Sequence, residues 1–158
     1  MANIDSLDLV AQALVNKITT AAANGLLHDA LGDTILQPAN VFYGDQSKYP
    51  AVPAVAIEPN SRPRTLNGLS FRTDNNFTVY ILCYHSQLDQ SIQKTRQQIQ
   101  QLSENIETLI HQDPQLGGLL VHCFCENNES GYTYRSGTLY RSNRITFSGY
   151  SKTMLRNP

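Results

Sequence analysis

The segment from Phe77 to Tyr84 constrains the fold of this 158-residue chain more than any other. Side chains of a β-strand alternate between the two faces of a sheet, and here both faces are largely apolar. One face would carry Phe77, Val79, Ile81 and Cys83, and the other Thr78, Tyr80, Leu82 and Tyr84. A strand that is apolar on both faces needs packed elements on each side. We therefore expect it at the centre of a covered sheet.

An amphipathic helix is expected over about residues 5–24. Its apolar residues recur at spacings of three and four, which places them on one stripe: Leu7, Val10, Leu14, Ile18 and Ala21. Asp5 or Ser6 offers a side-chain oxygen that can cap the free N–H groups of the first turn. Asn24-Gly25 supplies a left-handed stop.

A second, longer helix is expected over about residues 89–112. Asp89 can cap its start, and Asp113-Pro114 ends it because proline disfavours helical geometry in the preceding residue. The stripe that would face the core is Ile92, Ile99, Leu102, Ile106 and Leu109. The opposite face is polar, with Gln93, Gln97, Gln100, Glu104 and Glu107.

Shorter strands complete the expected layout. They are placed at residues 41–43, at 54–57 with Pro59 as the end, at 119–126, and within 138–150. Residues 60–76 read as a basic, mobile loop or hairpin with a turn at Asn67-Gly68. Residues 127–131 read as a loop and 151–158 as a flexible tail. The fold class is α+β: a mixed or antiparallel sheet packed by two main helices, in one domain over residues 1–158.

Charge is low and unevenly distributed. Charged residues make up 16 % of the chain and the net charge is −1, which gives no general signal for nucleic-acid binding. Residues 1–59 carry mostly acidic side chains. In residues 130–158 every charged residue is basic: Arg135, Arg141, Arg144, Lys152 and Arg156. The acidic N-terminal region and the basic C-terminal region could bind partners of opposite charge. The simpler interpretation is that these charges are scattered by chance over solvated surfaces.

No segment predicts a membrane span, a signal peptide or a familiar catalytic motif. Cys83-x-His85 and Cys123-x-Cys125 each place two soft ligands on one face of a strand. If those strands were neighbours, a zinc or thiol site would be conceivable. The alternative is that the cysteines are small buried apolar residues. We expect no catalytic residues, no cofactor and no metal, and synthesis in a reducing host cytoplasm.

Five arginines are the candidate partner-binding residues. Arg62, Arg64 and Arg72 lie in or beside the 60–76 stretch, where guanidinium groups can pair with a partner's carboxylates or with phosphates. Arg141 and Arg144 lie on opposite faces of the last strand and would belong to a basic C-terminal docking surface. The alternative is that both are solvated or paired within the subunit.

The order of these elements resembles the tail terminator, or tail completion, proteins of long-tailed bacteriophages. The similarity covers nearly the whole chain and is carried by three segments: the "YPAVPAVAIEP" stretch at 49–59, the strand at 77–84, and the helix ending in "ENIETLIHQDPQLGG". It is a similarity of layout, since this family has no strict catalytic motif. The length of the 60–76 stretch departs from it, and a neck connector might carry such a stretch equally well.

The resemblance implies a structural virion protein and not an enzyme. Such a protein forms a homo-oligomeric ring, usually of six subunits, that caps the tail tube, stops its polymerisation and joins the tail to the head or neck. Its partners are then other copies of itself, the tail tube protein, a possible sheath, the neck connector, and phage DNA that passes through the lumen without sequence recognition. Two alternatives stay open: another neck connector or baseplate adaptor, and a small metal or thiol enzyme using Cys83, His85, Cys123 and Cys125.

Overall fold

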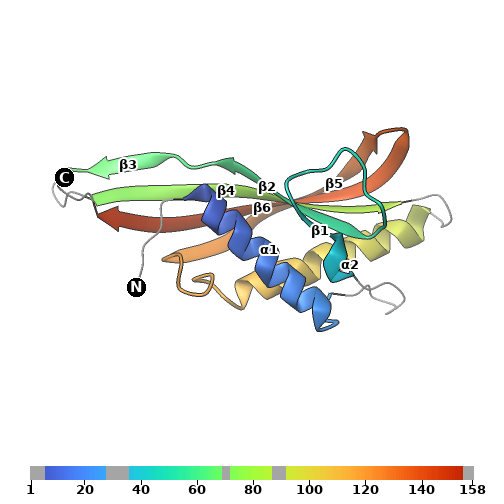
Figure 1. Cartoon of the computed structure of the whole chain (residues 1–158), viewed down its shortest axis with the longest axis horizontal. Helices are drawn as coiled ribbons and strands as arrows, with labels where there is room; N and C mark the ends of the chain where they lie inside the picture. Colours follow the sequence, from blue (N-terminus) through green and yellow to red (C-terminus); the bar gives the residue numbers. More distant parts are fainter. Residues whose placement is uncertain (1–5, 28–35, 69–71, 87–91, 155–158) are drawn as a thin grey trace.

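The computed structural model describes residues 6–27, 36–68, 72–86 and 92–154. Within these ranges, two α-helices, one 3-10 turn and six strands follow one another (Figure 1). Their bounds are α1 Leu7–Ala23, η1 Pro38–Asn40, β1 Val41–Tyr43, β2 Ala54–Ser61, β3 Arg64–Asn67, β4 Arg72–Ser86, α2 Ile92–His111, β5 His122–Arg135 and β6 Thr138–Met154. The α+β fold class predicted from the sequence is confirmed.

The six strands form one mixed sheet in the order β1-β2-β4-β6-β5, and β3 pairs with β4 beyond the end of β2. The β1–β2 pair is parallel and every other pair is antiparallel. The long strand β4 lies between β2 and β6, as its two apolar faces predicted. Its register places Ile81 opposite both Ile57 and Ile145.

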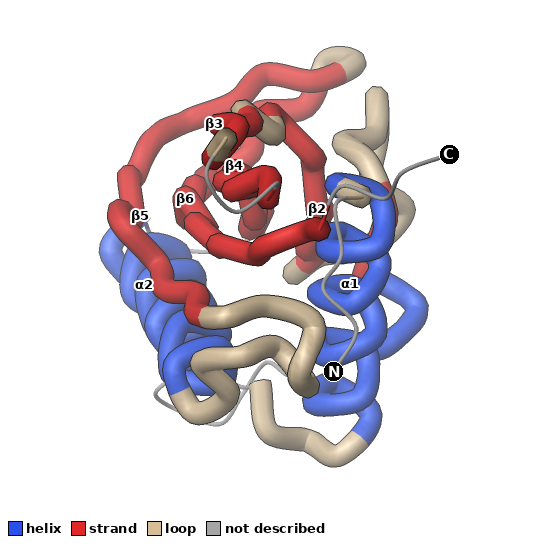
Figure 2. The backbone as a smooth tube through the Cα atoms, turned by 90° about the vertical axis from the view of Figure 1, so that its left-hand side faces the viewer, coloured by secondary structure: helices blue, strands red, loops and turns tan. Residues whose placement is uncertain are grey.

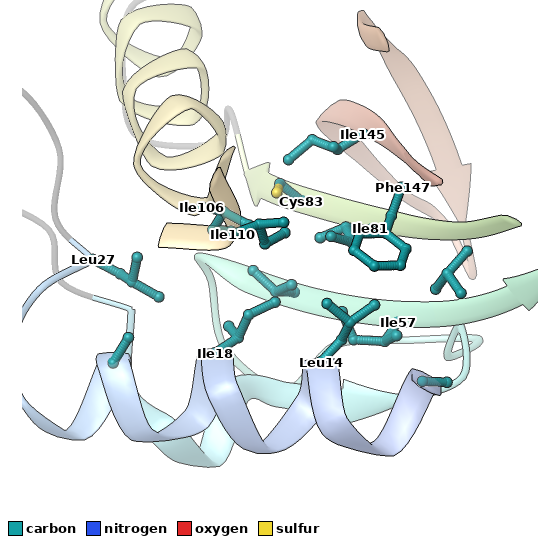
Figure 3. Close-up of a cluster of buried hydrophobic side chains, with 14 of the residues drawn as sticks. Leu14, Ile18, Leu27, Ile57, Ile81, Cys83, Ile106, Ile110, Ile145 and Phe147 are labelled. Carbon is teal, nitrogen blue, oxygen red and sulfur yellow. The ribbon is translucent and has the colours of Figure 1, made fainter. Parts of the chain in front are cut away.

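Both helices pack on one face of the sheet, and the main core lies between them and the strands (Figures 2 and 3). Helix α1 contributes Leu14 and Ile18, and α2 contributes Ile106 and Ile110. The facing strands supply Ile57, Phe77, Val79, Ile81, Cys83, Ile145 and Phe147, all fully buried. Burial of this apolar surface is the main source of stability for the arrangement.

A smaller cluster covers part of the opposite face. Tyr49, from the segment between β1 and β2, packs against Tyr84 and Tyr140 with ring centroids 4.7 and 5.9 Å away. Leu82 and Phe42 pack at its border. The central strand is therefore covered on both sides over this part of its length.

The helix ends match the capping chemistry of the sequence. The Ser6 hydroxyl accepts from the N–H of Leu9 at 3.3 Å, and Gly25 has φ +69°, a left-handed conformation that glycine adopts without strain. Asp5 and Asp89, the other proposed caps, lie outside the described residues. The two helices span 7–23 and 92–111, within two or three residues of the predicted bounds.

The expected end of the second strand at Pro59 is wrong, because β2 continues to Ser61. The carbonyl of Ile57 accepts from Gly44 on the outer edge of β2, at 2.8 Å. Pro59 lies two residues further and faces the same edge, beyond the end of β1. A missing N–H there costs no hydrogen bond between strands.

The described residues of the 60–76 stretch include two paired strands, as expected for a hairpin, the second of the two forms predicted. β3 pairs with the start of β4, with Arg64 opposite Asn75 and Asn67 opposite Arg72. The prediction of a flexible tail is wrong for residues 151–154. These residues extend β6 and pair with the first residues of β4, which also pair with β3. Asn75 explains this extension, because its buried amide donates to Thr153 Oγ1 at 2.9 Å and to Ser151 Oγ at 3.4 Å. Residues 155–158 lie outside the described part.

The prediction of a loop at residues 127–131 is also wrong, because these residues continue strand β5. A register shift between Cys125 and Asn127 admits one extra residue, and pairing with β6 then resumes. The amides explain why this polar stretch remains a strand. Asn143 donates to Asn128 Oδ1 at 3.0 Å, and Asn128 donates to Ser103 of α2 at 3.0 Å.

Asp113 ties α1 to the turn after α2, and this contact predicts a pH dependence. Its carboxylate accepts from the N–H of Gly117 and lies 3.1 Å from Lys17 Nζ. The Gly117 hydrogen bond, followed by the lysine, holds the pKa of Asp113 below its usual 3.8. The contribution to stability is therefore complete above pH 3.8 and is lost as the pH falls through the lowered pKa.

Replacing Asp113 with asparagine should lower the free energy of unfolding by up to about 1 kcal/mol at pH 7. The difference from the original protein should shrink in acid, once the aspartate is protonated. Urea unfolding at pH 7 and near pH 3 checks this. A difference that grows in acid would show that the carboxylate does not act through its charge.

Candidate functional site

Three of the five candidate arginines lie on one projecting part of the sheet, which we call the arm. The arm comprises residues 62–67 with the parts of β4 and β6 alongside them, 72–76 and 150–154. Figure 1 shows it extending past the start of α1 at one end of the long axis. Arg62 lies between β2 and β3, Arg64 lies on β3, and Arg72 lies on β4 with its Nε 3.4 Å from Asp74 Oδ1.

Arg141 and Arg144 lie elsewhere, on β6, and on opposite faces as predicted. Arg141 is only 7 % exposed, and its guanidinium lies over the ring of Tyr132, 4.6 Å from the centroid. Arg144 is exposed; its Nη2 donates to Glu129 at 2.7 Å, and it lies over Tyr80. The contacts of both arginines are therefore made within the subunit, as in the alternative given above. Only Arg144 offers much exposed surface to a partner.

The charge difference between the two ends of the chain is partly neutralised inside the subunit. Asp45, from the acidic N-terminal region, forms an ion pair with Arg135 of β5. Asp45 also accepts hydrogen bonds from Tyr49 and from Tyr84, the latter at 3.1 Å. Ser136 adds a bond to the carbonyl of Ser47 at 3.0 Å. These contacts fix the β5–β6 hairpin against the 44–50 segment.

The cysteines do not form the soft-ligand site considered from the sequence. Strand β6 lies between β4 and β5, so Cys83 is opposite Asn143, whereas Cys123 is opposite Gly149. The premise that the two strands are neighbours is therefore wrong. Among the described residues, no three His, Cys, Asp or Glu side chains are grouped so as to hold a metal ion.

The environment of the thiols opposes nucleophilic chemistry. Burial raises the pKa of Cys83, and it raises the pKa of Cys123 to about 11 and of Cys125 to about 12. A reactive cysteine needs a lowered pKa, because the thiolate is the nucleophile. These three side chains fit the role of small buried apolar residues better than that of reactive thiols.

The first half of β5 is shielded along its outer edge. The N–H of Cys123 donates to the carbonyl of Pro114 at 2.8 Å, and that of Cys125 donates to His111 Nε2 at 3.0 Å. The N–H of Asn128 donates to the side chain of Asn127 at 2.9 Å. Protein groups thus occupy N–H groups that an added strand would need. Beyond Asn128 the strand runs on into the hairpin with β6.

Exposed apolar side chains gather at the two ends of the sheet. At the β5–β6 hairpin, Tyr134 is 70 % exposed and lies opposite Leu139, with Tyr132 exposed two residues away. On the arm, Leu66 is 63 % exposed. Sequence reasoning missed all four, although Tyr132 and Tyr134 alternate as strand residues do. Their exposure depends on the packing of the folded chain, which no local sequence pattern reveals.

Comparison with known proteins adds little. No protein-family model matches the chain, and a search of curated proteins found no match. Among solved structures, a chain of the "Virion of native gene transfer agent (GTA) particle" matches with a TM-score of 0.35 and 9 % sequence identity, over 85 % of this chain and 94 % of that chain. A similarity at this level does not establish a shared function. In the described part of the chain, no helix has the length and apolar character needed to cross a membrane.

Proposed function

We propose that this protein is a structural subunit of a phage-like virion, a tail terminator that assembles into a ring on the end of the tail tube. The observation that carries the proposal is a sheet with an edge strand at each end and exposed apolar residues at both ends. A subunit of that kind is suited to head-to-tail contacts that close into a ring. The order of its elements is also the one that suggested this family.

The ring, most simply of six subunits, stops tube polymerisation and joins the tail to the head or neck. Its partners are its own copies, the tail tube protein, a sheath where the tail has one, and the neck connector. Phage DNA passes through the lumen without sequence recognition. The protein then resides in the virion, at the tail or neck, after synthesis in the host cytoplasm. No enzymatic activity and no cofactor belong to this proposal.

A second candidate, a neck connector, is favoured by one feature. The arm extends beyond the helices and offers a basic surface on a long hairpin, which suits insertion into a neighbouring ring. The two candidates differ in what the ring binds: a tail terminator binds tube ends, whereas a connector binds the head portal complex.

Electron microscopy with purified tail tubes and purified heads from the same particle tests the proposal. The expected result is a closed ring at one end of each tube and none on tailless heads alone. Rings found only on heads would support the connector. A stable two-fold dimer that binds neither would overturn the proposal.

A further inference from the structure

The last residue of α2 contacts the outer edge of strand β5 through its imidazole ring. Helix α2 lies alongside β5 (Figure 2), and His111 Nε2 accepts a hydrogen bond from the backbone N–H of Cys125 at 3.0 Å. Nearby, the N–H of Cys123 donates to the carbonyl of Pro114 at 2.8 Å. These two bonds attach the start of β5 to the end of α2 and to the turn that follows it.

The bond from Cys125 requires one form of the His111 ring. A backbone N–H only donates, so Nε2 must present a lone pair, and the neutral ring then carries its hydrogen on Nδ1. A protonated ring donates from both nitrogens and would place one N–H against another. The bond is therefore present with the neutral ring and is lost when the ring takes up a proton. The bond from Cys123 to a backbone carbonyl does not titrate.

The charges close to His111 favour the protonated ring. His111 lies in the last turn of α2, where the helix dipole favours a positive charge. Glu107 lies one turn earlier, a spacing at which helical side chains meet. Burial, followed by the charge of Glu107, raises the pKa of the Cys125 thiol to about 12, which places that carboxylate near the hydrogen bond. The bond thus favours the neutral ring and the surrounding charges favour the protonated one.

Several neighbouring groups keep one charge state where histidine titrates, roughly between pH 5 and 8. The titratable groups on the elements next to the ring are Glu107 on α2, Asp113 in the following turn, Lys17 on α1, Cys83 on β4, and Cys123, Cys125 and Glu126 on β5. Burial raises the pKa of all three thiols, which stay neutral. Asp113, whose pKa is lowered from 3.8, stays ionised and paired with Lys17.

We propose that His111 is a pH-dependent latch: its neutral ring holds the end of α2 against β5, and protonation releases it. Release leaves the N–H of Cys125 without this acceptor on the outer edge of β5, beside the register shift between Cys125 and Asn127. Ile106 and Ile110 are fully buried and keep the rest of the helix packed. Acid thus removes one of the groups that shield this edge from an added strand.

Amide hydrogen exchange at Cys125 measures the latch directly. Between about pH 8 and pH 5, the protection of this amide, corrected for the intrinsic exchange rate, should fall roughly two- to tenfold, as expected for the loss of one hydrogen bond. The amide of Ile81, in the centre of the sheet, should keep its protection. Nitrogen NMR of the neutral His111 ring should show its hydrogen on Nδ1.

Two substitutions of His111 separate the proton from the hydrogen bond. His111→Gln keeps an acceptor close to the position of Nε2 but does not titrate, so protection of Cys125 should be the same at both pH values. His111→Leu removes the acceptor and should give low protection at both. His122→Gln is the matched control, because His122 lies on β5 but stacks on Tyr150; it should keep the pH dependence.

Three results would overturn the latch. They are unchanged protection of Cys125 in the original chain, an equal acid-induced fall in His111→Gln, and a parallel fall at Ile81, which would indicate global destabilisation. Circular dichroism checks the fold of each variant. If His111→Leu does not fold, the original chain, His111→Gln and His122→Gln still decide the question. Tube capping plays no part in these measurements, so the latch and the proposed function succeed or fail separately.

Discussion

Replacing Phe147 with alanine is expected to lower the free energy of unfolding by about 3–5 kcal/mol. Phe147 is fully buried in the main core on the helix side of β6 (Figure 3), and its ring lies close to Gly149. The site has little room to adjust: a Cβ on Gly149 would lie 2.7 Å from Leu120 Cδ1 and 3.2 Å from the Phe147 ring. The loss would be a large share of the roughly 5–15 kcal/mol that stabilises a typical domain.

Phe124 provides the matched control for this prediction. It lies on β5, but its side chain is 46 % exposed. Phe124→Ala should therefore cost no more than about 1–1.5 kcal/mol, well below the loss expected at Phe147. Urea denaturation with both variants measures the difference through the midpoint at constant slope. Similar losses in the two would mean that the face packed by the helices is not the main core.

Deleting residues 61–69 is expected to abolish ring formation while leaving the subunit folded. The described residues among them lie outside the two buried clusters, and β4 would still pair with β6 beyond its first few residues, which the shortened connection from Asn60 cannot reach. If the arm meets a neighbouring subunit or the tube, the deletion removes Arg62 and Arg64 from that contact, and hydrogen bonds to charged groups are worth about 1.5–3 kcal/mol. A loss of about 2 kcal/mol would weaken each contact about 30-fold.

Circular dichroism and tube capping separate the two parts of this prediction. The deletion variant should show the original spectrum and thermal transition, and its tubes should end without a ring. Capping at the original efficiency would remove the arm from the assembly. Loss of the folded spectrum would show instead that the arm stabilises the subunit itself.

The fold class was predictable because its strongest signals are local. The two apolar faces of 77–84 placed β4 at the centre, and the three-and-four spacing of apolar residues located both helices to within a few residues. The errors arose where tertiary contacts outweighed composition. Asn127–Gly131 reads as a loop, yet Asn128 is held in β5 by hydrogen bonds to Ser103 and from Asn143. Ser151–Met154 reads as a tail, yet Asn75 bonds it to β4.

The candidate surface was only partly predictable. A basic stretch at 60–76 was evident, and the structure gathers Arg62, Arg64 and Arg72 on the arm. Arg141 could not be told from Arg144 by sequence, because both lie on one strand and only packing decides which is buried. The exposed aromatic pair of the β5–β6 hairpin was missed for the same reason.

The central claim is that this protein ends tube growth, and a two-step elongation assay measures that most directly. Tubes are incubated with this chain, washed, and supplied with fresh tube protein, and their lengths are measured by electron microscopy. Tubes treated with the chain should keep their initial length and carry a ring at one end, while untreated tubes grow. Growth of treated tubes at the untreated rate, with no ring at either end, would contradict the account.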